Sequence, residues 1–336
     1  MATNAINTRE NLLLAARMTH NNEIIDVAEV LNETNEVLQD ATISQANDIT
    51  SHVVSRRTAL PTPSWVKVGN GWNAGVATLQ QARETIGMIK SRYTCPADVM
   101  KLQPNKAKYR AQQERPHVEA IGQELSNTLI GNWSAGSLTG APPEEFDSLS
   151  TRYPTLGTTS SAYVANNGNT SGSDNTSIWF IQWGPGKVYL IYPRNSETVG
   201  LQREDKGLVF TAGDNVTTTQ GNQLWSYITE FSWDVGLCVE DTRCVKRLAN
   251  IDSVSTETYT LNENKIIETR NNFKTQGTIY MYCNETVYTQ LQILAKDKTN
   301  VHWTESNPFG KPVMYFLDMP IRRCDAITNV EATLTT

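Results

Sequence analysis

Two short apolar runs separated by a glycine-rich turn constrain the fold of this 336-residue chain more than any other feature. The runs are residues 178–181 (IWFI) and 188–192 (VYLIY), and both are rich in β-branched and aromatic residues, which favour strands. Gly184-Pro185-Gly186 between them is typical of a turn. The pattern predicts a β-hairpin.

The turn sequence does not predict a phosphate site, although Lys187 follows its second glycine. A P-loop needs a longer spacing between its glycines, a serine or threonine after the lysine, and a following helix. Here Val188 follows the lysine, and the strand pattern resumes at once.

A longer run around this motif resembles a segment of the major capsid proteins of short-tailed (podovirus-type) tailed bacteriophages, which have the Hong Kong 97-type fold. The run covers residues 173–252 and contains SDNTSIWFIQWGPGKVYLIYPRNS, VGLQREDKG and WDVGLCVEDTRCVKRLANID in that order. LPTPSWVK (60–67) and ETIGM (84–88) also match the family's sequences. The resemblance covers nearly the full chain and is weakest over residues 4–20 and 211–222.

The resemblance implies an α+β fold with an N-terminal arm, an extended loop, a spine helix in a peripheral domain, and a mixed α/β apical domain. The expected division of the chain is as follows: 1–48, arm with an amphipathic helix; 49–93, extended loop formed by a long β-hairpin; 94–135, spine helix of the peripheral domain; 136–222, loop-rich and β portion of the apical domain; 223–260, long strands of the peripheral domain; 261–336, strand-helix-strand core of the apical domain and the C-terminus.

The residues themselves support parts of this division. Apolar residues from Ile24 to Leu38 recur at helical spacing with acidic residues on the other faces, which predicts an amphipathic helix. Such a helix is either an arm that docks its apolar stripe elsewhere or a helix that packs on its own domain, and the pattern does not decide between them. Pro61 and Pro63 exclude a helix and predict an extended outgoing segment. Glycines from 69 to 75 predict a tip, and residues 76–89 predict the returning segment, although a solvent-exposed arm of another kind of protein would give the same pattern.

A second helix is predicted in the segment before residue 131. Val118, Ile121, Leu125 and Leu129 recur at spacings of three and four, and Gly131 predicts the end of that helix. Pro116 predicts that the helix, over about 106–131, is kinked or has two parts.

The last section predicts the order strand, helix, strand, strand. Asn284 is expected to cap its helix, and Gly310-Lys311-Pro312 is expected to form a hairpin turn.

Charge and composition exclude several classes of function. A net charge of -6 without any block of basic residues argues against tight or sequence-specific binding of nucleic acid. It is compatible with a shell that encloses double-stranded DNA without gripping it. Five scattered cysteines without CxxC spacing predict free, mostly buried thiols. No run approaches the length of a membrane span, so no membrane partner is expected.

Catalytic motifs are absent from the sequence. No GxSxG elbow is present, and the four histidines lie in separate segments, so no catalytic residue, metal ligand or cofactor is expected. Glu204-Asp205 and Glu240-Asp241 are the acid pairs nearest aromatic strands, and they leave a glycoside hydrolase as a remote alternative. A β-rich tail protein or carbohydrate-binding protein is a second alternative. Its binding groove would use the following tryptophans, although core positions are more typical of them: Trp179, Trp183, Trp225 and Trp233.

The resemblance therefore implies a structural protein rather than an enzyme, which self-assembles through hexamers and pentamers into the icosahedral head of a double-stranded DNA phage. A portal protein at one vertex is the implied partner, with scaffolding and decoration proteins as further candidates, and no N-terminal scaffolding segment is expected on this chain. The implied location is the virion, after assembly in the host cytoplasm. Lys67 and Lys90 lie where some relatives form isopeptide links, but no such link is predicted. The candidate intersubunit contacts are Arg56, Arg57, Trp65, Lys67, Arg322 and Arg323.

Overall fold

The computed structural model describes residues 19–20, 23–24, 35–131, 145–157, 163–169, 172–196, 199–212, 223–254, 260–296 and 314–335. The chain forms two compact units, which are described separately. Unit 1 contains Met1–Glu33, Met88–Leu125 and Glu197–Asp234, and unit 2 contains Thr34–Gly87, Ser126–Ser196 and Val235–Thr336.

Unit 2 is built on a six-stranded mixed sheet with the strand order β14-β15-β13-β8-β12-β7. Strand β8 lies inside the sheet and runs antiparallel to both of its neighbours, whereas β12–β7 and β13–β15 are parallel pairs. The elements of this sheet and its helices are α5 (Leu149–Arg152), β7 (Val164–Asn166), β8 (Asn175–Ile181), β12 (Val245–Asp252), α6 (Glu263–Asn271), β13 (Tyr280–Cys283), α7 (Glu285–Lys296), β14 (Tyr315–Phe316) and β15 (Met319–Arg323).

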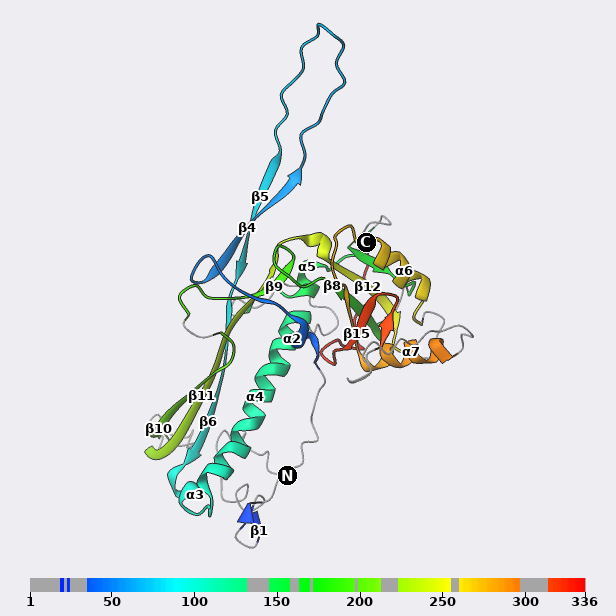
Figure 1. Ribbon diagram of the computed structural model, residues 1–336. Coiled ribbons are helices and arrows are strands. Elements are labelled where there is room, and N and C mark those ends of the chain that lie inside the picture. The colour runs from blue at the N-terminus through cyan, green and yellow to red at the C-terminus, as the bar shows by residue number, and fades with distance from the viewer. Residues whose placement is uncertain are drawn as a thin grey trace. The chain divides into compact units, whose positions relative to one another are not determined.

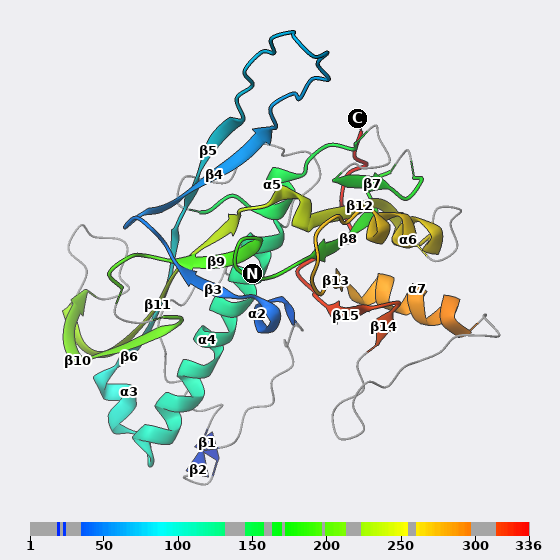
Figure 2. The same cartoon turned by 45° about the horizontal axis from the view of Figure 1, so that its top comes forward.

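Both longer helices of unit 2 pack on the same apolar cluster of this sheet (Figure 2). Ile266 of α6 and Val287 of α7 are fully buried against strand residues such as Phe180. Asn284 caps α7, since its side-chain oxygen accepts the backbone N–H of Val287 at 3.0 Å. The predicted strand-helix-strand-strand order is confirmed, whereas helix α6 was not predicted. The predicted turn at 310–312 lies outside the described residues.

The predicted hairpin of residues 178–192 is wrong in its pairing. The turn is present, with positive φ angles at Gly184 and Gly186, but β8 pairs with β12 and β13. Strand β9 (Val188–Tyr192) pairs instead with β11 and with β3 (Ile43–Gln45). All seven residues of β8 are buried, so this strand has partners on both edges and is covered on both faces.

The C-terminal segment crosses the β8–β12 part of unit 2. Asn175 and Glu331 exchange two backbone hydrogen bonds of 3.3 and 2.9 Å. The buried Glu331 carboxylate also accepts a hydrogen bond from Arg247 at 3.0 Å, and the Arg247 guanidinium lies 4.9 Å from the centre of the Trp179 ring. A buried ion pair of this kind fixes the position of the segment, since breaking it would leave an unpaired charge.

A long antiparallel hairpin also belongs to unit 2 (Figure 1). Its strands are β4 (Ser51–Ala59) and β5 (Thr78–Thr85), paired from Ser51↔Thr85 to Ala59↔Thr78. The expected outgoing and returning segments are thus confirmed, but the returning strand ends at Thr85. The next strand, β6 (Gly87–Pro96), pairs with β11, so the segment up to residue 93 is not part of the hairpin.

Unit 1 contains a helix and long strands around a second core. Its elements are β1 (Thr19–His20), β2 (Glu23–Ile24), most of β6, α3 (Ala97–Lys101), most of α4 (Lys106–Ile130), β10 (Gln202–Ala212) and most of β11 (Gln223–Val239). Strands β10 and β11 form antiparallel pairs from Gln202↔Ser232 to Ala212↔Gln223. Tyr93, Tyr109, Ile121 and Phe231 are the large buried side chains of this core.

Helix α4 confirms the predicted helix of 106–131, with Pro116 inside a single assigned helix and Gly131 at its end with a φ of 80°. Its predicted apolar face is correct for Ile121, Leu125 and Leu129, but Val118 is exposed. The predicted N-terminal helix is wrong at its start, where Glu23–Ile24 is a strand, whereas Leu38 at its end lies in the short helix α2 (Val37–Asp40). Residues 25–34 lie outside the described residues.

Candidate functional site

The connection between β4 and β5 carries the most exposed apolar side chains of the chain's described part. Trp65 and Val68 are fully exposed, and Trp72 is 77% exposed. Lys67 is exposed beside them. Exposing two tryptophans to water is unfavourable in an isolated subunit, because burial of a large aromatic side chain would gain a large hydrophobic free energy. These residues form a surface that another molecule can cover.

The tip of this connection contains an ordered turn. The backbone N–H of Asn70 donates to the carbonyl of Lys67 at 3.0 Å, and Gly69 between them has a φ of 92°. That pattern is a β-turn with glycine at its third position, which non-glycine residues adopt only with strain. A Cβ on Gly75 would lie 2.9 Å from the Cβ of Pro61, so the two arms of the connection lie close together.

The base of the hairpin is held by an ion cluster within unit 2. The Glu84 side chain, only 3% exposed, accepts from Arg56 at 2.8 Å and from Arg152 at 2.7 Å. Arg56 also donates to the carbonyls of Val239 and Glu240, the latter at 3.1 Å. The predicted contact residue Arg56 is therefore already bonded within its own chain, whereas Arg57 beside it is exposed and has no ion pair with a described carboxylate.

The second predicted arginine pair also binds acids of its own chain. Arg322 forms a forked pair with Asp40, with nitrogen-oxygen distances of 2.9 and 3.0 Å, and Tyr282 donates to the same carboxylate at 3.1 Å. Arg323 binds Asp325 at 2.9 Å and Glu285 at 2.9 Å. These pairs join β15 to α2, to α7 and to the segment that follows β15. Asp40 and Glu285 lie far from the two arginines along the chain, so the sequence could not show these pairs, whereas Asp325 is only two residues from Arg323.

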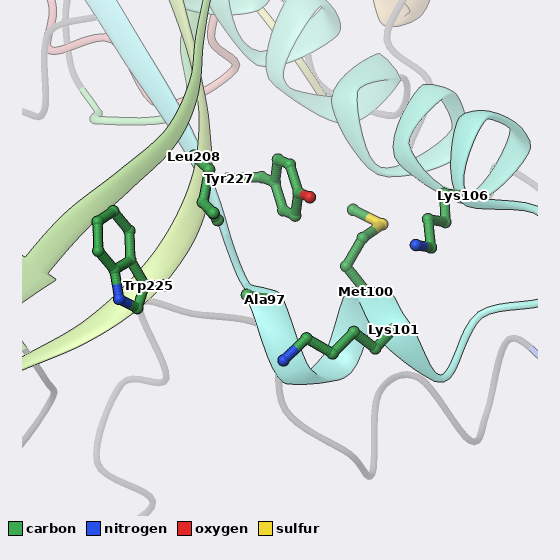
Figure 3. Close-up of a pocket in the computed structure, with 7 residues that line it drawn as sticks. All are labelled: Ala97, Met100, Lys101, Lys106, Leu208, Trp225 and Tyr227. Carbon is green, nitrogen blue, oxygen red and sulfur yellow. The ribbon is translucent and has the colours of Figure 1, made fainter.

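A hollow of about 180 Å³ lies in unit 1 between α3 and the strands β10 and β11 (Figure 3). Its lining residues are Ala97, Met100, Lys101, Lys106, Leu208, Trp225 and Tyr227. Trp225, expected in a core, is 54% exposed and contacts Phe210 with ring centres 5.1 Å apart. Trp179 and Trp183 are buried as expected. The lining contains no carboxylate, histidine or cysteine, so it lacks the groups of an acid-base or nucleophilic site.

The two acid pairs considered from the sequence are bound to neighbouring groups. Asp205 binds Arg110 at 2.6 Å, and this hydrogen bond holds the pKa of the carboxyl below its ordinary value. Glu204 pairs with Lys206, and Asp241 pairs with Arg243 at 2.8 Å. Glu240 accepts from the Tyr189 hydroxyl at 3.1 Å. In this arrangement the carboxylates act as structural acceptors.

A histidine lies among aromatic rings in the core of unit 1. His117 stacks on Phe231 with ring centres 6.0 Å apart, meets Tyr93 edge-on at 5.9 Å, and lies 2.7 Å from the Ser91 hydroxyl through its Nδ1. Burial lowers the pKa of His117 below 6.5, against the opposing effect of Glu114.

The described residues contain no group of three or more His, Cys, Asp or Glu side chains placed to hold a metal ion. Among the described helices, none is both long and apolar enough to cross a membrane. All five cysteines lie in the described residues, are buried and form no disulfide, as predicted, and burial raises the pKa of Cys238 to about 11.

Sequence reasoning missed Trp72, Glu84 and Arg152. Trp72 could have been found, since a tryptophan between Gly71 and Asn73 in a glycine-rich tip has few residues to pack against. The contact between Glu84 and Arg152 had no such signal, because the two residues lie far apart in the sequence.

Comparison with known proteins identifies one family. The family profile described as major capsid protein GP7 matches residues 19–335. No curated protein matches the chain. A chain in the near-atomic cryo-EM structure of bacteriophage Epsilon15 is 26% identical, with a TM-score of 0.76 and full coverage of both chains.

Two more distant structures are also similar. One is the capsid of bacteriophage JBD30 decorated with minor capsid protein trimers, at 10% identity and a TM-score of 0.45 over 94% of this chain and 98% of that one. The other is the SrpI encapsulin complex of Synechococcus elongatus, at 12% identity and a TM-score of 0.43 over 73% of this chain and 98% of that one.

Proposed function

This chain belongs to the major capsid protein family GP7, and from that membership we propose how its copies join. The protein is a structural subunit of an icosahedral phage head and has a Hong Kong 97-like fold. We propose that its copies assemble as hexamers and pentamers, and that the protein works by self-association without catalytic turnover.

The exposed hairpin connection is the observation that supports this proposal best. Trp65, Val68 and Trp72 expose apolar surface at the end of a paired β-ribbon. Contiguous exposed apolar surface on a soluble protein marks an interaction site, and covering it with a second subunit removes it from water. The hairpin thus acts as an arm whose tip is covered by a neighbouring copy.

The six candidate contact residues divide into two roles in this proposal. Trp65, Lys67 and Arg57 are exposed on the hairpin and contact the neighbouring copy directly. Arg56, Arg322 and Arg323 first bind acids of their own chain. Each is partly exposed, so a remaining N–H donor can bind an acid of the neighbour in addition.

We further propose which domain of the shell subunit each unit forms, and what the shell contains. The six-stranded sheet with α6 and α7 forms the apical domain, while α4 and the long strands β10 and β11 form the peripheral domain. The shell is located in the virion, assembles in the host cytoplasm, and encloses double-stranded DNA. A portal protein occupies one vertex. The net charge of -6 supports enclosure without tight binding, since like charges keep the packed polymer free of the wall.

Electron microscopy of the purified protein tests the proposal. We expect closed shells or rings of six copies. A compact monomer at high concentration that hydrolyses a glycan or an ester would overturn it.

A second experiment tests the hairpin surface. The double variant Trp65→Ser, Trp72→Ser is expected to lower the shell yield without changing the melting temperature of the subunit. Val330→Ser, at an exposed apolar residue outside the hairpin, is the matched control. An equal loss of shells in both variants would show that the hairpin tip has no special role.

A further inference from the structure

Among the polar contacts at the base of the β4–β5 hairpin, which include a hydrogen bond of 3.0 Å between His52 and the Tyr189 hydroxyl, two guanidinium groups converge on one buried carboxylate. Glu84, near the end of β5, is 3% exposed and receives one guanidinium from each of two different elements. Arg56 comes from β4 at 2.8 Å, and Arg152 comes from α5 at 2.7 Å. Glu84 therefore joins both strands of the hairpin to a helix that is not part of it.

The two arginines extend this connection to the end of β11. Arg152 donates to the carbonyl of Leu237 at 3.2 Å, and Arg56 donates to those of Val239 and Glu240. Charge-assisted hydrogen bonds from a planar guanidinium have a defined direction, since both the donors and the acceptors are fixed. The cluster thus restricts the orientation of the hairpin about its base.

Apolar contacts below the cluster hold the base in place without fixing its direction. Val54 and the partly buried Ile86 pack with Ala46, Tyr189 and Cys238. Hydrophobic contact depends on the area covered and is not directional. If apolar contacts alone held its base, the hairpin could tilt at a small cost in free energy. Polar contacts at the base oppose such a tilt.

We propose that Glu84 is a positioning residue, which sets the direction in which the hairpin leaves unit 2 and thereby the neighbouring copy that its tip can reach. This inference rests on the proposed function of the hairpin as an intersubunit arm. A small tilt at the base becomes a large displacement at Trp65 and Trp72, because they lie beyond the paired strands. An arm that tilts freely reaches several places on a neighbour and fits none well.

Glu84→Gln is the direct test, because it keeps the size of the side chain and removes its charge. The change leaves two guanidinium groups beside a neutral amide, which weakens both bonds. Arg152→Lys is the second variant, since it keeps the charge but cannot bind Glu84 and the Leu237 carbonyl through one planar group. Glu268→Gln is the matched control, because this carboxylate of unit 2 binds Lys265 at an exposed position outside the hairpin base.

The hairpin direction can be measured by electron-electron double resonance in the full chain. Spin labels are attached to Ala59→Cys, at the end of β4, and to Thr289→Cys, on the exposed side of α7. The five native cysteines are buried, so the labels react selectively with the introduced thiols. A narrow distribution of distances is expected in the parent and in Glu268→Gln, and a broader or shifted one in Glu84→Gln and Arg152→Lys. Shell yield is measured in parallel on unlabelled protein.

The outcomes separate this inference from the proposed function. Unchanged distance distributions in both base variants would overturn the positioning role, whatever the shell yield. Broadened distributions with a normal shell yield would overturn the link between hairpin direction and choice of neighbour. Failure of the unchanged chain to form shells would count against the proposed function alone, since the distance measurement does not depend on assembly.

Discussion

A glycine in β11 determines how closely the hairpin base approaches that strand. A Cβ on Gly236 would lie 2.4 Å from the carbonyl oxygen of Thr85 and 3.0 Å from the side chain of Ile191. Both neighbours belong to paired strands, so neither can move away easily. The side chain is excluded because backbone, rather than a flexible group, fills the space.

Gly236→Ala is therefore expected to destabilise unit 2 by about 1–3 kcal/mol, the usual cost of forcing a methyl group into a filled space. Urea unfolding followed by circular dichroism measures the change. Gly122→Ala in helix α4 is the control, because a Cβ there meets nothing within 4 Å. Alanine favours helix, so the control is expected to be neutral or stabilising by up to about 1 kcal/mol. Equal destabilisation in both variants would contradict the argument from space.

His117 is expected to make the stability of unit 1 depend on pH. Its pKa is lowered in the folded chain, chiefly by burial, so the unfolded chain binds the proton more tightly. The stability that the neutral ring contributes is fully present above pH 6.5, the ordinary pKa of histidine. It is lost as the pH falls from there through the lowered pKa of the folded chain.

His117→Phe keeps an aromatic ring between Tyr93 and Phe231 but removes the titrating nitrogens. The melting temperature of the variant is expected to fall less than that of the parent between about pH 7.5 and about pH 5.5. The loss of the Ser91 hydrogen bond is expected to lower the variant's stability at both pH values alike. An identical pH dependence in the two proteins would assign the effect to other groups.

The hairpin is an element whose outer part contributes little to the stability of its own unit. Every residue from 60 to 76 is exposed, and the described contacts of this stretch are local. Deleting residues 66–76 is therefore expected to change the free energy of unfolding by less than about 0.5 kcal/mol, as at other exposed positions. The same deletion is expected to abolish closed shells in electron micrographs. If the shortened chain does not fold, the segment belongs to the core instead.

Elements with strong local signals could be predicted from the sequence, and their partners could not. The spacing of Ile121, Leu125 and Leu129 specifies α4, and Pro61 with Pro63 excludes a helix in the hairpin, because these signals act within a few residues. The pairing of β8 depends on β12 and β13, which follow much later in the chain. Two apolar runs beside a turn look alike whether they pair with each other or enter different sheets.

The candidate contact residues show the same limit. Arg56 and Arg57 are neighbours in the sequence and looked equivalent, yet only Arg56 meets the buried Glu84. Strand alternation places the two side chains on opposite faces of the hairpin. The glycines and prolines of the tip were enough to predict that it is exposed. The ion pair between an arginine and an acid far away in the sequence could be found only from the structure.

At the scale of the whole molecule, this difference predicts separate effects on the subunit and on the shell. Arg56→Ala is expected to lower the stability of the isolated subunit by about 2 kcal/mol, because it leaves part of the Glu84 charge unpaired. Arg57→Ala is expected to change it by less than about 0.5 kcal/mol. Calorimetry of dissociated subunits and of assembled shells checks both values.

With Arg57 in contact with the neighbouring copy, as proposed above, the Arg57→Ala variant is further expected to lower the heat resistance of the shell, since the loss of a modest contact would recur at every subunit boundary. Shells of Arg57→Ala that melt like the parent would show that Arg57 is ordinary surface charge. A subunit unaffected by Arg56→Ala would contradict the importance of the ion cluster.

The strand pairing of unit 2 determines the order in which its parts can fold during protein synthesis. Strand β8 gains its partners only when β12 and β13 have been made, and its first residue, Asn175, bonds to Glu331 near the far end of the chain. A ribosome delivers these segments in order, so at least one edge of β8 stays open until β13 has emerged, and the contact of Asn175 with Glu331 forms later still. The hairpin strands β4 and β5 are thus made early, whereas unit 2 completes its sheet only after the later segments have been made.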